Sequence, residues 1–130
     1  MKDAMLLRSA LLMPLTVLTF AVPMVNAAEA DAKATHQRGW NALRAMDCAR
    51  CHGRDYAGWT APSLIDSVRD GSRERFDHWV LEGDVVRGMP GYRSQPLVVA
   101  EIDAIYAYLL ARARRDIGPG RPSGAAEGTR

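Results

Sequence analysis

Two cysteines and a histidine stand together in the stretch DCARCHG: Cys48, Cys51 and His52. Cys48 and Cys51 are the only cysteines of the chain. Thiols at this spacing, followed at once by an imidazole, can attach haem, bind zinc or carry out disulfide exchange. These three chemistries need different partners elsewhere in the sequence.

Zinc and disulfide exchange both lack those partners. A structural zinc site needs four Cys or His ligands, and the remaining histidines, His36 and His78, are not at finger-like spacing. A thioredoxin-like motif lies between a strand and a helix, whereas no alternating strand pattern occurs here. The motif therefore predicts one covalently attached haem c, with thioether bonds to Cys48 and Cys51 and with His52 as a ligand of the iron.

The other side of the iron separates two classes of protein. An electron carrier has a second protein ligand there, whereas a haem enzyme or gas sensor keeps the position open. Met46 is too close to the cysteines in sequence to reach the opposite face, and we expect His36 and His78 at the surface. Met89 lies much further along, in RGMPGY. We predict Met89 as the second axial ligand.

Glycine and proline around Met89 support this prediction. Gly88 allows the backbone to come close to the porphyrin, and Pro90 and Gly91 fix the turn that presents the sulfur.

Helices and loops must position these residues. A helix is predicted over about 35–46, and residues 53–71 are predicted to be mostly loop. Ser72 can cap a second helix that ends at Gly83. A last and stronger helical pattern precedes residue 117. Apolar positions of these last two helices, expected to pack around the haem, are Phe76, Trp79, Val80, Ile102 and Leu109. The pattern predicts a small all-α domain of three to four helices with long loops.

The start of the chain resembles a secretory signal peptide over residues 1–27. We expect cleavage after Ala27 or Ala28, because Pro14 and Pro23 interrupt the apolar stretch and make a permanent membrane anchor a poor fit. No twin arginine is present, so the general secretory route to the periplasm is expected. Covalent haem attachment fits that route.

Composition limits the partners. The net charge of +2 and the lack of a basic run argue against nucleic-acid binding. Residues 28–35 are predicted to be a flexible lead-in, and the Gly/Pro-rich residues 118–130 a disordered tail. Trp59, Arg69 and Arg73 are candidates for holding the haem propionates.

Together these residues resemble the class I c-type cytochromes over roughly 36–113, within a domain that we place at 36–117. The resemblance rests on CARCH, on Pro62 in APSL, on Met89 in GMP and on the final AYLLARA. It implies a monohaem fold whose first and last helices cross, with Gly39 and Trp40 against Tyr106 or Tyr108. It also implies that the Pro62 carbonyl orients His52.

Narrower segments, including the ending GPGRP, are similar to the small cytochromes that accept electrons from quinoprotein alcohol dehydrogenases. This resemblance implies a periplasmic single-electron carrier, not an enzyme, with such a dehydrogenase as donor and a terminal oxidase as acceptor. Two alternatives stay open. One is a haem enzyme or gas sensor with an open sixth position, and the other is a haem subunit of a membrane oxidase or dehydrogenase complex.

Overall fold

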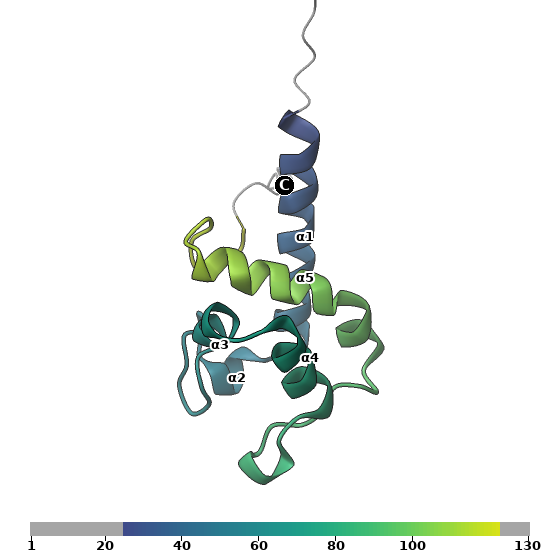
Figure 1. The fold of residues 1–130 in the computed structure, drawn as a ribbon, viewed down its shortest axis with the longest axis vertical. Coiled ribbons are helices and arrows are strands. Elements are labelled where there is room, and N and C mark those ends of the chain that lie inside the picture. The colour runs from purple at the N-terminus through teal and green to yellow at the C-terminus, as the bar shows by residue number, and fades with distance from the viewer. Residues whose placement is uncertain (1–24, 123–130) are drawn as a thin grey trace, which may run out of the picture.

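The computed structural model describes residues 25–122, which form helices joined by loops (Figure 1). Within this range the only β-type pairing is an isolated bridge between Asp84 and Met89. The prediction of an all-α fold is confirmed. The predicted leader lies outside the described residues except for its last few positions. In chain order the elements are α1 (Val25–Ala45), α2 (Ala49–His52), α3 (Leu64–Asp70), α4 (Arg73–Glu82), the 3₁₀ turn η1 (Val85–Arg87) and α5 (Pro96–Ala113).

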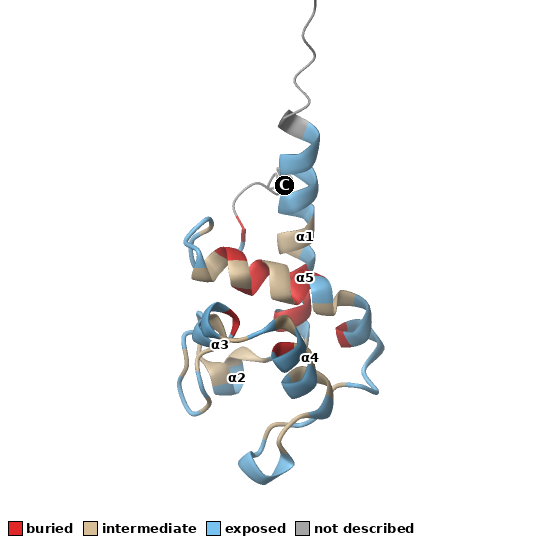
Figure 2. Cartoon of the chain, in the orientation of Figure 1, coloured by how far each residue is buried: buried red, intermediate tan, exposed pale blue. Residues whose placement is uncertain are grey.

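The core lies where α1 crosses α5 (Figures 1 and 2). Gly39 of α1 is buried and lies directly against the backbone of Ala104 and Ile105. A side chain at residue 39 would collide with both of these residues. The predicted helix crossing is therefore present, although Gly39 meets backbone rather than a tyrosine ring. Around it lie Ala42, Leu43, Val98, Tyr108 and Leu109, all buried.

Helix α3 occupies a segment that we predicted to be mostly loop. Ser63 caps it by accepting a hydrogen bond from the Asp66 N–H at 3.0 Å, and its Val68 is buried. Seven residues are too few to show a helical period, so the burial of Val68 in the tertiary fold determines this element.

Helix α4 begins and ends as predicted. The Ser72 hydroxyl accepts from the Arg75 N–H at 3.2 Å, and Gly83 stops the helix with a φ of 73°. Phe76 is buried and Val80 is half-buried. Trp79 was expected on the same apolar face, but it is 40% exposed, so that part of the prediction is wrong.

Both ends of the domain are more ordered than expected. Residues 28–35 are helical and continue α1, because their alanines favour helix and Glu29 pairs with Lys33 one turn on. Residues 118–122 fold back onto the domain. The Tyr108 hydroxyl donates to the Gly120 carbonyl at 2.8 Å, and Pro122 is buried. The structure therefore differs from the predicted flexible lead-in at residues 28–35 and from the predicted disordered tail at residues 118–122. Residues 123–130 lie outside the described range.

None of the helices between residues 25 and 122 combines the length and the hydrophobicity needed to cross a bilayer.

Candidate functional site

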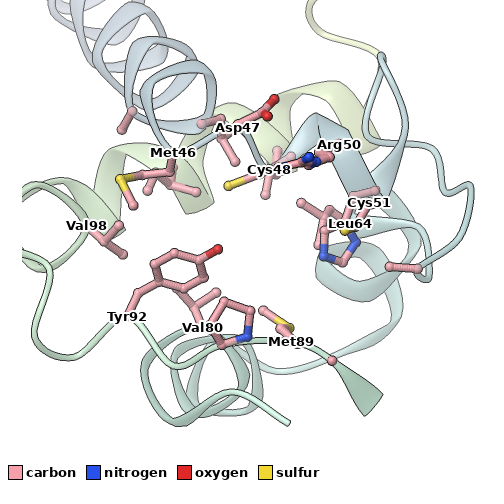
Figure 3. A pocket seen from close by; sticks show the side chains of 18 of the residues that line it. Met46, Asp47, Cys48, Arg50, Cys51, Leu64, Val80, Met89, Tyr92 and Val98 are labelled. Atoms are coloured by element: carbon pink, nitrogen blue, oxygen red, sulfur yellow. The ribbon is translucent and has the colours of Figure 1, made fainter. Parts of the chain in front are cut away.

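A cavity of about 570 Å³ opens between α1, α2, α4 and α5, within the range usual for cofactor pockets (Figure 3). Four side chains predicted to hold haem line it together: Cys48, Cys51, His52 and Met89. Its apolar walls come from Ala42, Leu43, Leu64, Phe76, Val80, Val98, Ile105 and Leu109. Of the five apolar positions expected around the haem, Trp79 and Ile102 do not line this cavity.

Helix α2 begins directly after Cys48 and contains Cys51, so the two thiols lie about one turn apart. The chain turns sharply after α1, with Asp47 at a φ of 51°, and the Cys48 N–H then donates to the Leu43 carbonyl at 3.1 Å. Both cysteines are free, as thiols must be before they can form thioethers. Burial raises the pKa of the Cys48 thiol to about 11, and the negative charge of Asp47 acts in the same direction.

His52 is oriented by the loop that follows it. Its Nδ1 donates to the Pro62 carbonyl over 2.7 Å, the contact that the resemblance implied. Backbone hydrogen bonds hold this loop against α2, from the Gly58 N–H to the His52 carbonyl at 2.9 Å and from the Ala61 N–H to the Cys51 carbonyl at 3.0 Å. A proton on Nδ1 leaves the lone pair of Nε2 available, which is the state that binds a metal.

Met89 reaches the cavity from a tight loop after α4. Figure 3 shows it across the cavity from Cys48. Its N–H donates to the Asp84 carbonyl at 2.9 Å, and the Asp84 N–H donates to the Met89 carbonyl at 2.8 Å. Gly88 has a left-handed backbone with a φ of 83°, so this loop needs glycine there for its conformation as well.

The other candidate ligands are placed less favourably. Met46 lines the cavity, but it lies with Asp47 and Cys48 at the end of α1 (Figure 3). His36 and His78 do not line the cavity. The His78 ring is exposed and lies 5.7 Å from the Trp79 ring, centroid to centroid.

The residues expected to hold propionates lie elsewhere. Trp59 is 77% exposed and does not line the cavity. Arg69 pairs with acidic neighbours on α3, and Arg73 pairs with Asp77 and Asp103. The guanidinium groups of Arg69 and Arg73 are therefore already bound by carboxylates away from the cavity.

Five polar residues that the sequence analysis did not single out also line the cavity: Asp47, Arg50, Thr60, Arg87 and Tyr92. Figure 3 shows the Tyr92 hydroxyl pointing into the cavity, and burial raises the pKa of that hydroxyl. Arg50 lies between the two cysteines and Arg87 two residues before Met89, so nearness to the motifs was the available signal.

These residues fit a haem. Two thiols on one helical turn, an imidazole with a free Nε2, and a thioether from another loop meet around one largely apolar cavity. Between residues 25 and 122 no three His, Cys, Asp or Glu side chains gather as they would for a bare metal ion. Two thiols, an imidazole and a thioether are the donor set of haem c.

Comparison with known proteins gives the same result. The family model described as cytochrome c oxidase, cbb3-type, subunit III matches residues 34–109. The crystal structure of the c-type cytochrome XoxG from Methylobacterium extorquens AM1 is similar, with a TM-score of 0.62 and 32% identity. That match covers 68% of this chain and 56% of the XoxG chain, so the chain spans little more than half the length of XoxG. A search of curated proteins found no match.

The family match covers more than half of the chain and includes the Cys48–Cys51–His52 motif and Met89. From the fold, the cavity and this match, the chain belongs to this cytochrome c family and binds haem c covalently.

Proposed function

We propose that the chain is a periplasmic carrier of single electrons in which His52 and Met89 are the two axial ligands of one haem iron. The observation that carries this proposal is the position of Met89, across the cavity from Cys48 and in a loop held by backbone hydrogen bonds. When bound, haem supplies an iron that changes between ferrous and ferric states.

The task of the chain is then to hold the ligands in place and to set the potential. Cys48 and Cys51 attach the cofactor, and the Pro62 carbonyl keeps His52 in one tautomer and orientation. A methionine ligand raises the reduction potential. Apolar walls such as Phe76 act in the same direction, because they disfavour the extra charge of ferric iron.

The donor we propose is a quinoprotein alcohol dehydrogenase, and the acceptor a terminal oxidase. The support is the resemblance of the segments around residues 62–92 and of GPGRP to cytochromes with such donors. The predicted leader and the covalent attachment of haem support a periplasmic location. The low net charge favours a weak, short-lived complex over one steered by a strongly basic surface.

Replacing Met89 tests the axial ligand. Met89→Ala is expected to lower the midpoint potential and to abolish the near-infrared charge-transfer band of methionine-ligated ferric haem. Met46→Ala is the matched control, because Met46 also lines the cavity, and it should keep both properties. The reverse pattern would make Met46 the ligand.

Carbon monoxide separates the carrier from a haem enzyme or gas sensor. Reduced wild-type protein with both positions filled should bind it slowly and incompletely. Rapid stoichiometric binding would show an open sixth position and would refute the carrier.

Mixing a reduced quinoprotein alcohol dehydrogenase with the oxidised protein tests the donor, because haem reduction within the mixing time is expected for a true pair.

A second function is favoured by the description of the matching family, a subunit of an oxidase. In that case the chain would serve as a haem subunit of a membrane complex. Fractionation of cells distinguishes the two, since a free carrier is recovered in the periplasmic extract and a bound subunit in the membrane fraction.

A further inference from the structure

We propose that a backbone clasp, formed by Gly83, Asp84, Met89 and Gly91, is the device that positions Met89 for the haem iron. The inference rests on the proposed function, because it takes Met89 as the axial ligand. It assigns a role to three residues that do not line the cavity: Gly83, Asp84 and Gly91.

The first part of the clasp is the paired hydrogen bond between Asp84 and Met89. Each N–H donates to the carbonyl of the other residue, at 2.8 and 2.9 Å. Both backbone groups of Met89 are therefore fixed at once. The intervening turn η1 and Gly88 close the loop between them.

The second part of the clasp is the close approach of the backbone at Gly83 to the backbone at Gly91. A Cβ at Gly83 would lie 2.5 Å from the Gly91 nitrogen and 2.6 Å from the Met89 carbonyl oxygen. A Cβ at Gly91 would lie 2.6 Å from the Glu82 carbonyl oxygen. Each glycine therefore leaves the space that the opposite backbone needs, and a side chain at either position would push the two arms of the loop apart.

Two further backbone hydrogen bonds connect the segment after Gly91 to α4. The Tyr92 N–H donates to the Val80 carbonyl at 3.0 Å, and the Arg93 N–H donates to the Leu81 carbonyl at 3.1 Å. Val80 itself lines the cavity. The backbone of Met89 is thus connected to the cavity wall through a short, continuous set of backbone contacts.

Apart from the clasp and the ion pair between Arg93 and Glu82, few contacts hold this loop. Val85 and Val86 at its tip are 80% and 98% exposed, so they bury almost no apolar surface. The Asp84 carboxylate also binds the Arg87 side chain at 2.7 Å and accepts from the Arg87 N–H at 3.3 Å, both within the loop. With no hydrophobic core of its own, the loop depends on the clasp for its shape.

Gly91→Ala is the cleanest test, because Gly91 does not have a positive φ and only the close approach is disturbed. External imidazole binds only molecules whose sixth position is free, so its apparent Kd on the haem-loaded ferric protein reports how firmly Met89 is held. We expect Gly91→Ala to bind imidazole about tenfold more tightly than wild type and to weaken the methionine charge-transfer band. Val86→Ala, in the same loop but exposed, should match wild type.

A double variant shows whether the glycine acts through the methionine. In a Met89→Ala background, adding Gly91→Ala should leave imidazole affinity unchanged. A further rise there, or wild-type affinity in Gly91→Ala alone, overturns the clasp. If Met89→Ala itself leaves the band and the affinity at wild-type values, the proposed ligand is wrong, which is a different failure.

Asp84→Ala provides a second variant if Gly91→Ala does not fold. It keeps the whole backbone and removes only the carboxylate that binds Arg87. Because the paired backbone hydrogen bonds between Asp84 and Met89 remain, the clasp predicts an imidazole affinity for Asp84→Ala within about twofold of wild type. Imidazole binding as tight as in Met89→Ala would show that the Asp84 carboxylate holds Met89, and it would overturn the clasp.

Discussion

Gly39 offers the sharpest test of the fold, because α1 and α5 touch there through backbone alone. A Cβ at residue 39 would lie 2.5 Å from the Ala104 carbonyl carbon and 2.9 Å from the Ile105 nitrogen, and closer still to the Ala104 oxygen. Ordinary contacts between such atoms are about 3.5 Å, so Gly39→Ala must separate the helices by roughly 1 Å or more. Backbone atoms cannot rotate out of the way as a side chain can.

The cost follows from what this separation disturbs. Leu43, Ile105 and Leu109 are all at most 4% exposed and belong to the same core cluster. Overpacking such a core costs about 1–3 kcal/mol, and the better helix propensity of alanine returns at most about 1 kcal/mol. Because this contact is backbone against backbone, we take the upper end of that cost and expect a net loss of about 2 kcal/mol in the free energy of unfolding, which corresponds to a fall in Tm of roughly 10 °C.

Urea unfolding of the haem-loaded protein, followed by far-UV circular dichroism, measures this loss. Gly118→Ala is the control, because a Cβ at residue 118 would meet nothing within 4 Å and the residue has no positive φ. It should stay within about 0.5 kcal/mol of wild type. If Gly39→Ala also stays within that margin, the helices do not approach as closely as the structure shows.

Two tyrosines give further predictions. Tyr108→Phe removes the hydrogen bond to the Gly120 carbonyl, so unfolding free energy should fall by about 1 kcal/mol and amides of residues 118–121 should exchange hydrogen faster; unchanged exchange would contradict the docked tail. Tyr56→Phe should leave stability unchanged or raise it by up to about 1 kcal/mol, because the buried Tyr56 hydroxyl has no hydrogen-bond partner within residues 25–122. Burial raises the pKa of Tyr56 from 10 to about 12, so the folded state keeps this proton more tightly than the unfolded state. Wild-type stability should therefore fall more than that of Tyr56→Phe as pH rises from 10 to 12, and equal losses in urea titrations would refute this assignment.

Sequence alone predicts the elements whose signals are local. Ser72 and Gly83 mark the ends of α4 through their own hydrogen bond and backbone conformation. The apolar spacing of α5 predicts the burial of Leu109, whereas Ile102, predicted on the same face, is only half-buried. Helix α3 has no such signal, since its formation depends on burying Val68 within the folded domain.

The site divides in the same way. The spacing of Cys48, Cys51 and His52, together with the lack of further zinc ligands and of a strand pattern in the sequence, predicts the cofactor. The contact between His52 and Pro62 follows from the family resemblance. By contrast, the approach of Gly91 to Gly83 joins residues whose relation exists only in three dimensions. Composition gives the wrong prediction for residues 118–122. A Gly/Pro-rich composition predicts disorder, but it contains no information on the hydrogen bond from Tyr108 to the Gly120 carbonyl.

Helix α1 has a consequence for how the protein can be attached to a surface. Its 21 residues correspond to a rod of roughly 30 Å, and residues 27–34 are exposed on the part that stands clear of the body (Figures 1 and 2). The loop with η1 lies at the opposite end of the long axis. A linker joined near Ala28 would therefore leave the Met89 loop facing the solution, so that a monolayer on an electrode would present every molecule in one orientation.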